Sequence, residues 1–229
     1  MSKPYSIVVL ISGSGSNLQA IIDQIKSGEI KAVISAVISN RPNAYGLERA
    51  KKENIPTRLV DHTQFDDRET FDKELSKIIN TYQADLVVLA GFMRILSDYF
   101  VNHYQHKLIN IHPSLLPKYK GLNTHDRALV DYKKGLIQEH GASVHFVIPE
   151  LDAGNVIIHG IVPILSEDDT NSLAERVHKV EHIIYPMAIR WLANGHLKNC
   201  DGKLILNGIA LKKPEKITLT AQNGLKREL

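Results

Sequence analysis

The sequence has 229 residues, of which 43% are hydrophobic and 23% charged, values typical of a globular chain with a sizeable core. The formal net charge is only +3 at pH 7 and is carried by the basic tail of residues 212–229, which argues against a nucleic-acid partner for the rest of the chain. The single cysteine excludes an internal disulfide, and no apolar stretch approaches the roughly 20 residues of a membrane helix, so we expect a cytoplasmic protein without a membrane partner.

The first half of the chain alternates short apolar runs with amphipathic segments. One such segment carries Leu18, Ile21 and Ile25 at the three- and four-residue spacing of a helix. Near-continuous apolar runs separated by helices are typical of an α/β fold with a doubly wound, mostly parallel sheet. The expected strands cover residues 5–11, 32–38, 57–60, 86–90 and 108–112.

The pattern changes after Gly135. Two apolar runs, at 143–148 and 156–165, have no helical segment between them, which predicts an antiparallel strand addition. A long C-terminal helix is expected next, kinked at Pro186 and ended by Gly195.

The sequence pattern predicts less regular structure in the C-terminal region. Asn207-Gly208 lies between two apolar triplets and is typical of a small hairpin. Beyond Lys212 we expect little order. We therefore expect one domain over residues 1–195, followed by a hairpin and basic tail over residues 196–229.

The segment Ser12-Gly13-Ser14-Gly15-Ser16-Asn17 follows the first expected strand and opens a helix. Backbone N–H groups and the helix dipole make such a place an anion site. The dinucleotide fingerprint fails, because Leu18 stands where the third glycine belongs and strand two ends in Ser39-Asn40 without an acidic residue. A monophosphate is thus a better ligand than NAD or ATP, and a tight turn without a ligand is the alternative.

Two polar residues interrupt the fifth apolar run. Asn110 and His112 are two positions apart, so their side chains share one face of a strand, and Pro113 ends that strand. The carboxyl ends of strands are where open α/β sheets keep their sites. A core strand with internally satisfied polar groups is the alternative.

Two further candidates have simple explanations. The run from His178 through Glu181 to His182 matches the H-x-x-E-H pattern of inverted zinc peptidases, but it lies in an amphipathic helix and no third ligand is identifiable. Asp152 lies in a glycine-containing loop, where an acidic residue is usually only a turn residue.

Five segments together resemble the folate-dependent formyltransferases, and specifically those that act on glycinamide ribonucleotide. The resemblance covers residues from about 5 to 195. The segments are ISGSGSNL at 11–18, AGFMRIL at 90–96, NIHPSLLP at 110–117 with Gly121 after it, SVHF at 143–146 and LDAG at 151–154.

The resemblance implies an α/β formyltransferase fold and a reaction of purine biosynthesis. The formyl group of 10-formyltetrahydrofolate passes to the primary amine of glycinamide ribonucleotide, with no metal and no covalent enzyme intermediate. The implied catalytic residues are Asn110, His112 and Asp152. Asn110 and a protonated His112 would stabilise the developing oxyanion, while Asp152 keeps the imidazole charged and relays a proton.

The resemblance also implies two sets of binding residues. The substrate's phosphate and ribose are expected at Gly15, Ser16, Asn17, His178 and Glu181. The folate is expected at Arg68, Met93, Arg94, Ile95, Leu96, Asn110, Ile148, Pro149, Glu150, Leu151 and Asp152. The segment 131–138 is longer than is usual in the family, and we expect a monomer or a homodimer.

Several alternatives share part of this pattern. Methionyl-tRNA formyltransferase would need a C-terminal tRNA-binding domain, which the residues after Gly195 are too few to form, and formyltetrahydrofolate hydrolase would need an N-terminal regulatory domain. A sugar-nucleotide formyltransferase lacks support from the full set of motifs. A zinc peptidase and a non-catalytic nucleotide-binding module are the alternatives from other functional classes.

Overall fold

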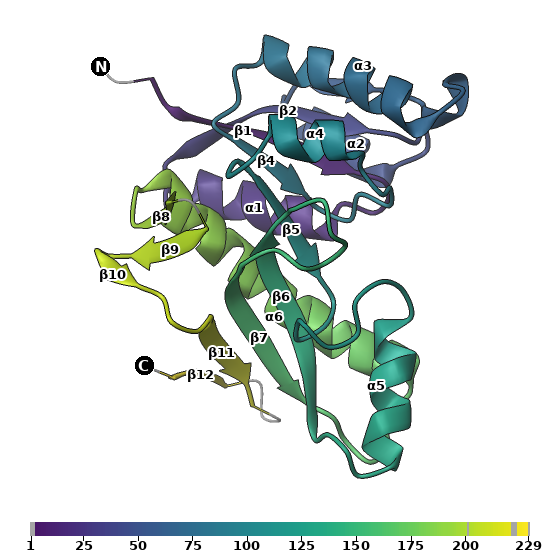
Figure 1. Cartoon of the computed structure of the whole chain (residues 1–229), viewed down its shortest axis with the longest axis vertical. Coiled ribbons are helices and arrows are strands. Elements are labelled where there is room, and N and C mark those ends of the chain that lie inside the picture. Colours follow the sequence, from purple (N-terminus) through teal and green to yellow (C-terminus); the bar gives the residue numbers. More distant parts are fainter. Residues whose placement is uncertain (1–2, 201, 221–223, 229) are drawn as a thin grey trace. The chain divides into compact units, whose positions relative to one another are not determined.

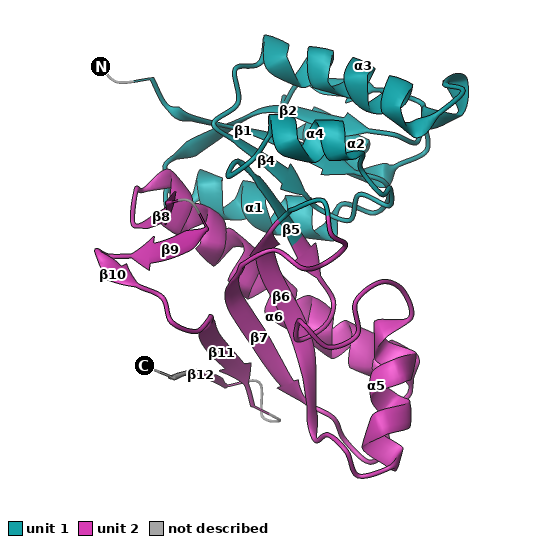
Figure 2. Cartoon of the chain, viewed as in Figure 1, with its two compact units in different colours: residues 1–110, 147–149 teal, residues 111–146, 150–229 magenta. Residues whose placement is uncertain are grey.

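The computed structural model describes residues 3–200, 202–220 and 224–228. The chain forms two compact units (Figure 2). Unit 1 comprises residues 1–110 and 147–149, and unit 2 comprises residues 111–146 and 150–229. The chain passes from unit 1 to unit 2 within strand β5 (Leu108–His112), between Asn110 and Ile111.

Unit 1 contains a parallel sheet with the strand order β5-β4-β1-β2-β3 (Figure 1). The central strand β1 is apolar along almost its whole length and pairs with β2 on one side and β4 on the other. This arrangement confirms the predicted α/β fold. Besides β5, the strands are β1 (Tyr5–Ile11), β2 (Ala32–Ser39), β3 (Thr57–Leu59) and β4 (Leu86–Leu89).

The helices of unit 1 connect these parallel strands. Side-chain caps begin three of them: Asp61 accepts from the Thr63 N–H, Asp67 from the Thr70 N–H, and Ser97 from the Phe100 N–H. The Ser97 cap agrees with the sequence, in which a serine and an acidic residue open that segment. The helices are α1 (Ser16–Lys26), α2 (Tyr45–Lys52), α3 (Arg68–Thr81), α4 (Asp98–His103) and the short 3₁₀ helix η1 (His62–Gln64).

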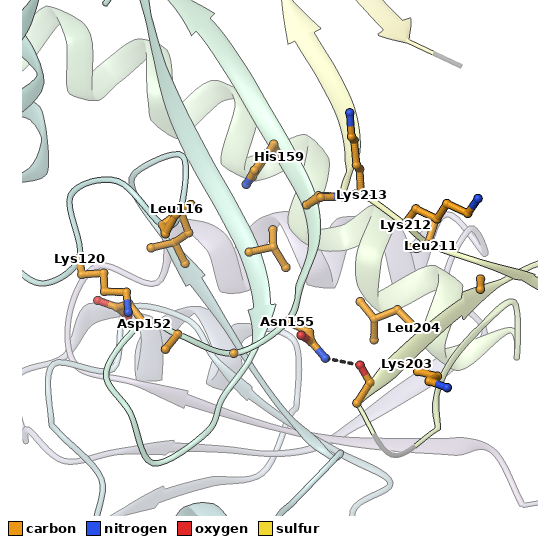
Figure 3. A pocket seen from close by; sticks show the side chains of 17 residues that line it. Leu116, Lys120, Asp152, Asn155, His159, Lys203, Leu204, Leu211, Lys212 and Lys213 are labelled. Carbon is orange, nitrogen blue, oxygen red and sulfur yellow. Dashed lines mark hydrogen bonds between the residues drawn. The ribbon is translucent and has the colours of Figure 1, made fainter.

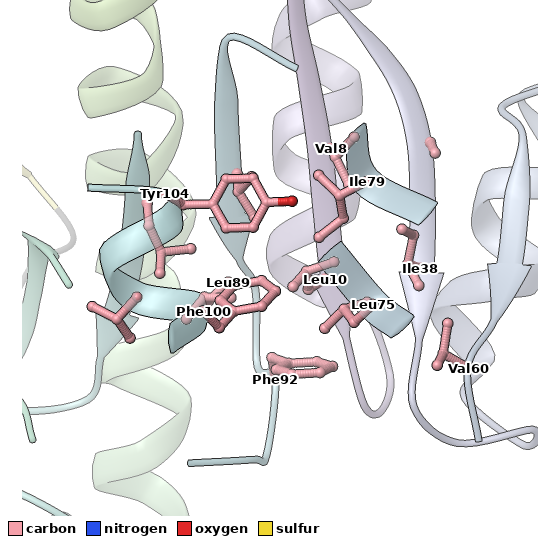
Figure 4. Packing of buried hydrophobic residues seen from close by; sticks show 14 of the residues in the cluster. Val8, Leu10, Ile38, Val60, Leu75, Ile79, Leu89, Phe92, Phe100 and Tyr104 are labelled. Atoms are coloured by element: carbon pink, nitrogen blue, oxygen red, sulfur yellow. The ribbon is translucent and has the colours of Figure 1, made fainter. Parts of the chain in front are cut away.

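One face of the unit 1 sheet packs against α3 and α4. In Figure 4, Phe92, Phe100 and Tyr104 lie with Leu75 and Leu89 in one buried cluster. Removing each such side chain from water stabilises the fold by about 1.5–3 kcal/mol. The cluster lies directly beneath the segment that follows β4, which carries part of the expected folate site.

Unit 2 is built on an antiparallel strand pair and a long helix. Strands β6 (Glu139–Phe146) and β7 (Val156–Pro163) pair antiparallel, as predicted. Helix α6 (Thr170–Ala193) packs on this pair, and Gly160 permits the close approach, because a Cβ there would lie 2.6 Å from a Val180 methyl group.

Both ends of α6 have residues of the types that begin and end helices. A capping box of Asp169 and Ser172 begins the helix, and Gly195, with φ 72°, follows its end. Helix α5 (Thr124–Lys133) was not expected from the sequence. The segment 131–138 therefore comprises the last turn of α5 and the turn that leads into β6.

The C-terminal region is more ordered than predicted. The expected hairpin joins β9 (Lys203–Leu206) to β10 (Ile209–Ala210), with Asn207 and Gly208 at φ 51° and 82°, and β8 (Leu197–Cys200) completes a three-stranded sheet.

The expectation of little order beyond Lys212 is wrong. Strand β11 (Glu215–Leu219) pairs parallel with β7, and β12 (Leu225–Glu228) pairs antiparallel with β11. A tail with few apolar residues forms a strand here because the β7 edge supplies backbone partners. Within the described part of the chain, no helix has both the length and the apolar character needed to span a membrane.

Candidate active site

The glycine-rich loop of unit 1 joins β1 to α1. Gly15 is the residue before the helix and has φ 70°; a Cβ there would lie 2.6 Å from the Gly46 Cα, so only glycine fits. Ser16 and Asn17 form the start of the first turn, and Gly15 has no side chain that could cap this end of the helix. A helix N-terminus that follows a glycine turn is a common place for an anion, and the phosphate site expected here from the sequence stays a prediction.

The segment after β4 presents apolar side chains to its surroundings. Met93 is 58% exposed and Ile95 63% exposed, whereas Leu96 packs against the buried cluster. The Arg94 guanidinium lies over the Phe71 ring at 5.2 Å. Two large exposed apolar side chains this close together favour an apolar ligand.

Arg68 lies in the same part of unit 1 as Arg94. Burial raises the pKa of the Asp72 carboxyl, and the charges of Arg68 and Arg94 both act in the opposite direction. Asp72 also accepts the Ser97 N–H at 2.5 Å. The structure thus gathers two of the expected folate residues around one buried carboxylate.

The other expected folate residues lie in the segment between β6 and β7, apart from Asn110 of β5. Ile148 and Pro149 belong to unit 1 and are exposed. Glu150 and Leu151 belong to unit 2, where Leu151 is 50% exposed. Asn110 is half-buried, at the last position of unit 1.

In unit 2, His112 and Asp152 form a buried pair. The His112 Nδ1 atom lies 3.5 Å from Asp152 Oδ2, and each side chain is less than one-tenth exposed. The His112 Nε2–H donates to the Tyr119 carbonyl oxygen at 2.9 Å. A carbonyl oxygen therefore accepts from one ring nitrogen, and a carboxylate oxygen lies near the other.

Asp152 has a left-handed backbone, with φ 48°. Such a conformation in a non-glycine residue is held by its surroundings and is common at functional sites. Here the Gly121 N–H donates to Asp152 Oδ2 at 2.8 Å, and Lys120 pairs with Glu150 at 2.9 Å. The loop that follows Pro117 therefore fixes the carboxylate beside His112.

A second histidine, His145 of β6, lies on the other side of Asp152. Its Nε2 atom is 3.9 Å from Asp152 Oδ1, and its Nδ1–H donates to the Phe146 carbonyl at 2.9 Å. Burial lowers the pKa of His145 to about 4, so this ring is neutral at neutral pH. His145 belongs to the segment SVHF at 143–146, but no pattern in the sequence places it beside Asp152.

Two more histidines lie near the pair and are also kept neutral. His125 of α5 and His140 of β6 are 3.2 Å apart, from Nδ1 to Nε2. Burial, and then the neighbouring His125 and His112, lower the pKa of His140 to about 3, and burial also lowers the pKa of His125. His125, His140 and His145 are thus neutral at neutral pH and add no positive charge near His112.

Helix α6 carries the last two expected residues. Glu181 is buried, at 4% exposed, whereas His178 is exposed and lies close enough to lower the pKa of His125. The zinc interpretation of His178 and His182 gains no third ligand: among the described residues, no group of three or more His, Cys, Asp or Glu is arranged to hold a metal ion.

A cavity of about 600 Å³ lies beside the Asp152 loop in unit 2 (Figure 3). The loop residues Asp152 to Val156 form one wall and the C-terminal segment 202–214 forms another. The Asn155 Nδ2 atom donates to the Gly202 carbonyl at 2.5 Å, drawn as a dashed line in Figure 3. The C-terminal segment is therefore bonded directly to the loop that carries Asp152.

Comparison with known proteins identifies the family. Residues 5–189 match the sequence profile described as formyl transferase. The chain is 52% identical over 203 residues to the phosphoribosylglycinamide formyltransferase of Escherichia coli (strain K12), over 89% of this chain and 94% of that protein. The chain belongs to the phosphoribosylglycinamide formyltransferase family. Members of this family are enzymes of purine biosynthesis, so the protein is a formyltransferase.

Solved structures agree with this assignment. The phosphoribosylglycinamide formyltransferase of Coxiella burnetii matches with a TM-score of 0.85 and 50% identity, over 91% of this chain and 96% of that one. A formyltetrahydrofolate deformylase from Pseudomonas syringae pv. tomato str. DC3000 matches with a TM-score of 0.81 but only 27% identity, and this chain covers 66% of it. The transferases are thus the nearer relatives of the two.

Proposed function

We propose that Asn110, His112 and Asp152 carry out formyl transfer from 10-formyltetrahydrofolate to the amine of glycinamide ribonucleotide. The observation that supports this most directly is the buried His112–Asp152 pair, with Nδ1 and Oδ2 3.5 Å apart and Nε2–H bonded to a carbonyl. A protein that only binds a nucleotide has no need of a charged imidazole held beside a carboxylate.

In the first step, the amine nitrogen attacks the formyl carbon and negative charge develops on the formyl oxygen. The Asn110 amide donates a hydrogen bond to that oxygen, and the positive charge of His112 stabilises it. Of the two ring nitrogens, Nε2 lies 2.9 Å from its acceptor and Nδ1 lies 3.5 Å from Asp152 Oδ2. The Nδ1–H therefore has the weaker bond in the protein and is the group that donates to the formyl oxygen.

In the second step, the bond between the formyl carbon and N10 of the folate breaks. The amine loses one proton and N10 gains one, so the proton count balances. Asp152 accepts the amine proton, directly or through a water molecule, and returns it toward N10. The products are formylglycinamide ribonucleotide and tetrahydrofolate.

The remaining residues bind the two substrates. The first-turn N–H groups of α1 at Gly15, Ser16 and Asn17 hold the phosphate, and His178 and Glu181 contact the glycinamide-ribose part. The folate ring system packs on apolar side chains, with Arg68 near its acidic tail. The folate residues are Arg68, Met93, Arg94, Ile95, Leu96, Asn110, Ile148, Pro149, Glu150, Leu151 and Asp152.

An assay of folate deformylation tests the proposal. The purified protein is incubated with 10-formyltetrahydrofolate, with and without glycinamide ribonucleotide. We expect tetrahydrofolate to form only when the ribonucleotide is present and formylglycinamide ribonucleotide to accumulate in equal amount. Release of formate without the ribonucleotide would assign the hydrolase reaction instead.

A second assay tests whether the reaction needs a metal ion. We propose a metal-free reaction in the cytoplasm by a monomer or homodimer, with small-molecule substrates and no nucleic-acid or membrane partner. Turnover should be unchanged after treatment with EDTA, and the zinc interpretation predicts loss of activity that zinc restores.

A further inference from the structure

The side chain of Ser12 connects three loops of unit 1. Ser12 follows β1, Asn40 follows β2, and the segment from Gly91 to Met93 follows β4. Because β1 lies between β2 and β4 in a parallel sheet, all three loops leave the same edge. The expected phosphate loop and the expected folate segment are therefore neighbours of this one residue.

The Ser12 hydroxyl both donates and accepts a hydrogen bond. Its Oγ–H donates to Asn40 Oδ1 at 2.6 Å, and Oγ accepts the Met93 N–H at 2.8 Å. The Ser12 N–H also donates to the Gly91 carbonyl at 3.0 Å. Ser12 is 5% exposed and Asn40 1% exposed, so water cannot easily replace these bonds.

Asn40 is itself fixed, and this determines the direction of the hydroxyl. The His62 Nδ1–H donates to the Asn40 carbonyl at 2.9 Å, which holds the residue at the end of β2. The Asn40 Oδ1 atom faces Ser12, so the hydroxyl proton points to Asn40 and a lone pair remains for the Met93 N–H.

We propose that Ser12 is a positioning residue that couples the binding of the two substrates. The inference rests on the proposed function, which places the phosphate at Gly15–Asn17 and the folate at Met93–Leu96. A ligand that orders either loop also orders Ser12, and through its hydroxyl the other loop. The second ligand then has less conformational entropy to remove and binds more tightly.

Binding measurements on the whole protein test the coupling without turnover. Glycinamide ribonucleotide and tetrahydrofolate form a non-reacting pair, because tetrahydrofolate has no formyl group to transfer. The Kd of tetrahydrofolate is measured by calorimetry with and without saturating ribonucleotide, and the Kd of the ribonucleotide with and without tetrahydrofolate. In the wild-type protein we expect each ligand to tighten the other by the same factor, about fivefold or more.

Three variants separate coupling from folding. Ser12→Ala removes the hydroxyl and should reduce the factor to less than about twofold, while Ser12→Thr keeps the hydroxyl and should preserve it. Ser6→Ala is the matched control, since Ser6 lies in β1, the strand that Ser12 follows, is 2% exposed and bonds Ser35 Oγ at 2.7 Å. Ser6→Ala should lower stability and leave the coupling factor unchanged. If Ser12→Ala does not fold, Asn40→Ala removes the same hydrogen bond from its other side.

The outcomes distinguish the two proposals. A wild-type protein that binds both ligands with no mutual effect overturns the coupling but leaves the proposed function standing. A protein that binds neither ligand overturns both. If Ser12→Ala folds and retains the wild-type factor, Ser12 is not the coupling residue.

Discussion

The His112 ring is held by the backbone of Tyr119, whose carbonyl oxygen accepts the Nε2–H at 2.9 Å. Tyr119 has a left-handed backbone, with φ 55°, and its hydroxyl donates to Asp131 Oδ2 at 2.7 Å. Asp131 belongs to α5. The orientation of the imidazole therefore depends on an acidic residue in the helix that the sequence did not reveal.

Tyr119→Phe should lower kcat about fivefold with little change in KM, because the lost hydrogen bond contributes about 1 kcal/mol to holding the Tyr119 backbone. Steady-state kinetics with both substrates measures this. Tyr132→Phe, the neighbouring tyrosine of α5, is the matched control. Equal kcat values for the two variants would contradict the role of Tyr119.

Asp152→Asn should lower turnover about 100-fold or more while the protein stays folded. Asparagine tolerates the left-handed backbone at φ 48° and can still accept the Gly121 N–H, so the variant removes mainly the charge. Circular dichroism and thermal melting check the fold, and a formyl-transfer assay checks activity. His112→Ala should lower turnover by a similar factor. Near-normal turnover in both variants would contradict the mechanism.

The free energy of unfolding should fall as the pH drops from 6.5 toward 4. Burial lowers the pKa of His145 to about 4 and that of His140 to about 3, from the ordinary value of 6.5. In this window the unfolded chain binds protons that the folded chain does not, so acid favours unfolding. Each histidine contributes at most about 1.4 kcal/mol per pH unit.

Urea denaturation between pH 7 and pH 4.5 measures this slope. His140→Gln should make the slope shallower, because the substituted side chain does not titrate. His196→Gln, at an exposed position outside the site, should leave the slope unchanged. The explanation fails if the two variants show the same pH dependence as the wild-type protein.

Asn155→Ala should lower kcat and increase hydrogen exchange in residues 150–156. The substitution removes the hydrogen bond to the Gly202 carbonyl that ties the Asp152 loop to the C-terminal segment. Exchange measured by mass spectrometry reports the loop directly. Asn171→Ala, at an exposed position of α6, is the control, and unchanged exchange in Asn155→Ala would show that this bond does not restrain the loop.

The fold of unit 1 could be predicted because its signals are local. Each strand is a short apolar run, and Ser97 is a residue type that begins helices. Helix α5 was missed because it buries little apolar surface, chiefly Ala128 and Leu129. Strand β11 was missed because its strand conformation comes from pairing with β7, which no local pattern encodes.

The candidate site divides in the same way. Asn110 and His112 share a face of one strand, so their relation follows from a spacing of two residues. Asp152 and His145 come close to His112 only when the chain folds. Asp152 could be predicted as a catalytic residue from the resemblance to a family, but not from its spacing in the sequence. The hydrogen bonds of Ser12 depend on which strands are neighbours in the sheet, which the sequence does not state.

The parallel pairing of β11 with β7 also affects how the protein is made. A ribosome synthesises β7 well before residues 215–219, so the edge of β7 has no partner during that interval. An apolar strand with a free edge is a template for joining other chains. Premature termination before Glu215 would make this exposure permanent, so shortened translation products should aggregate even when their catalytic residues are all present.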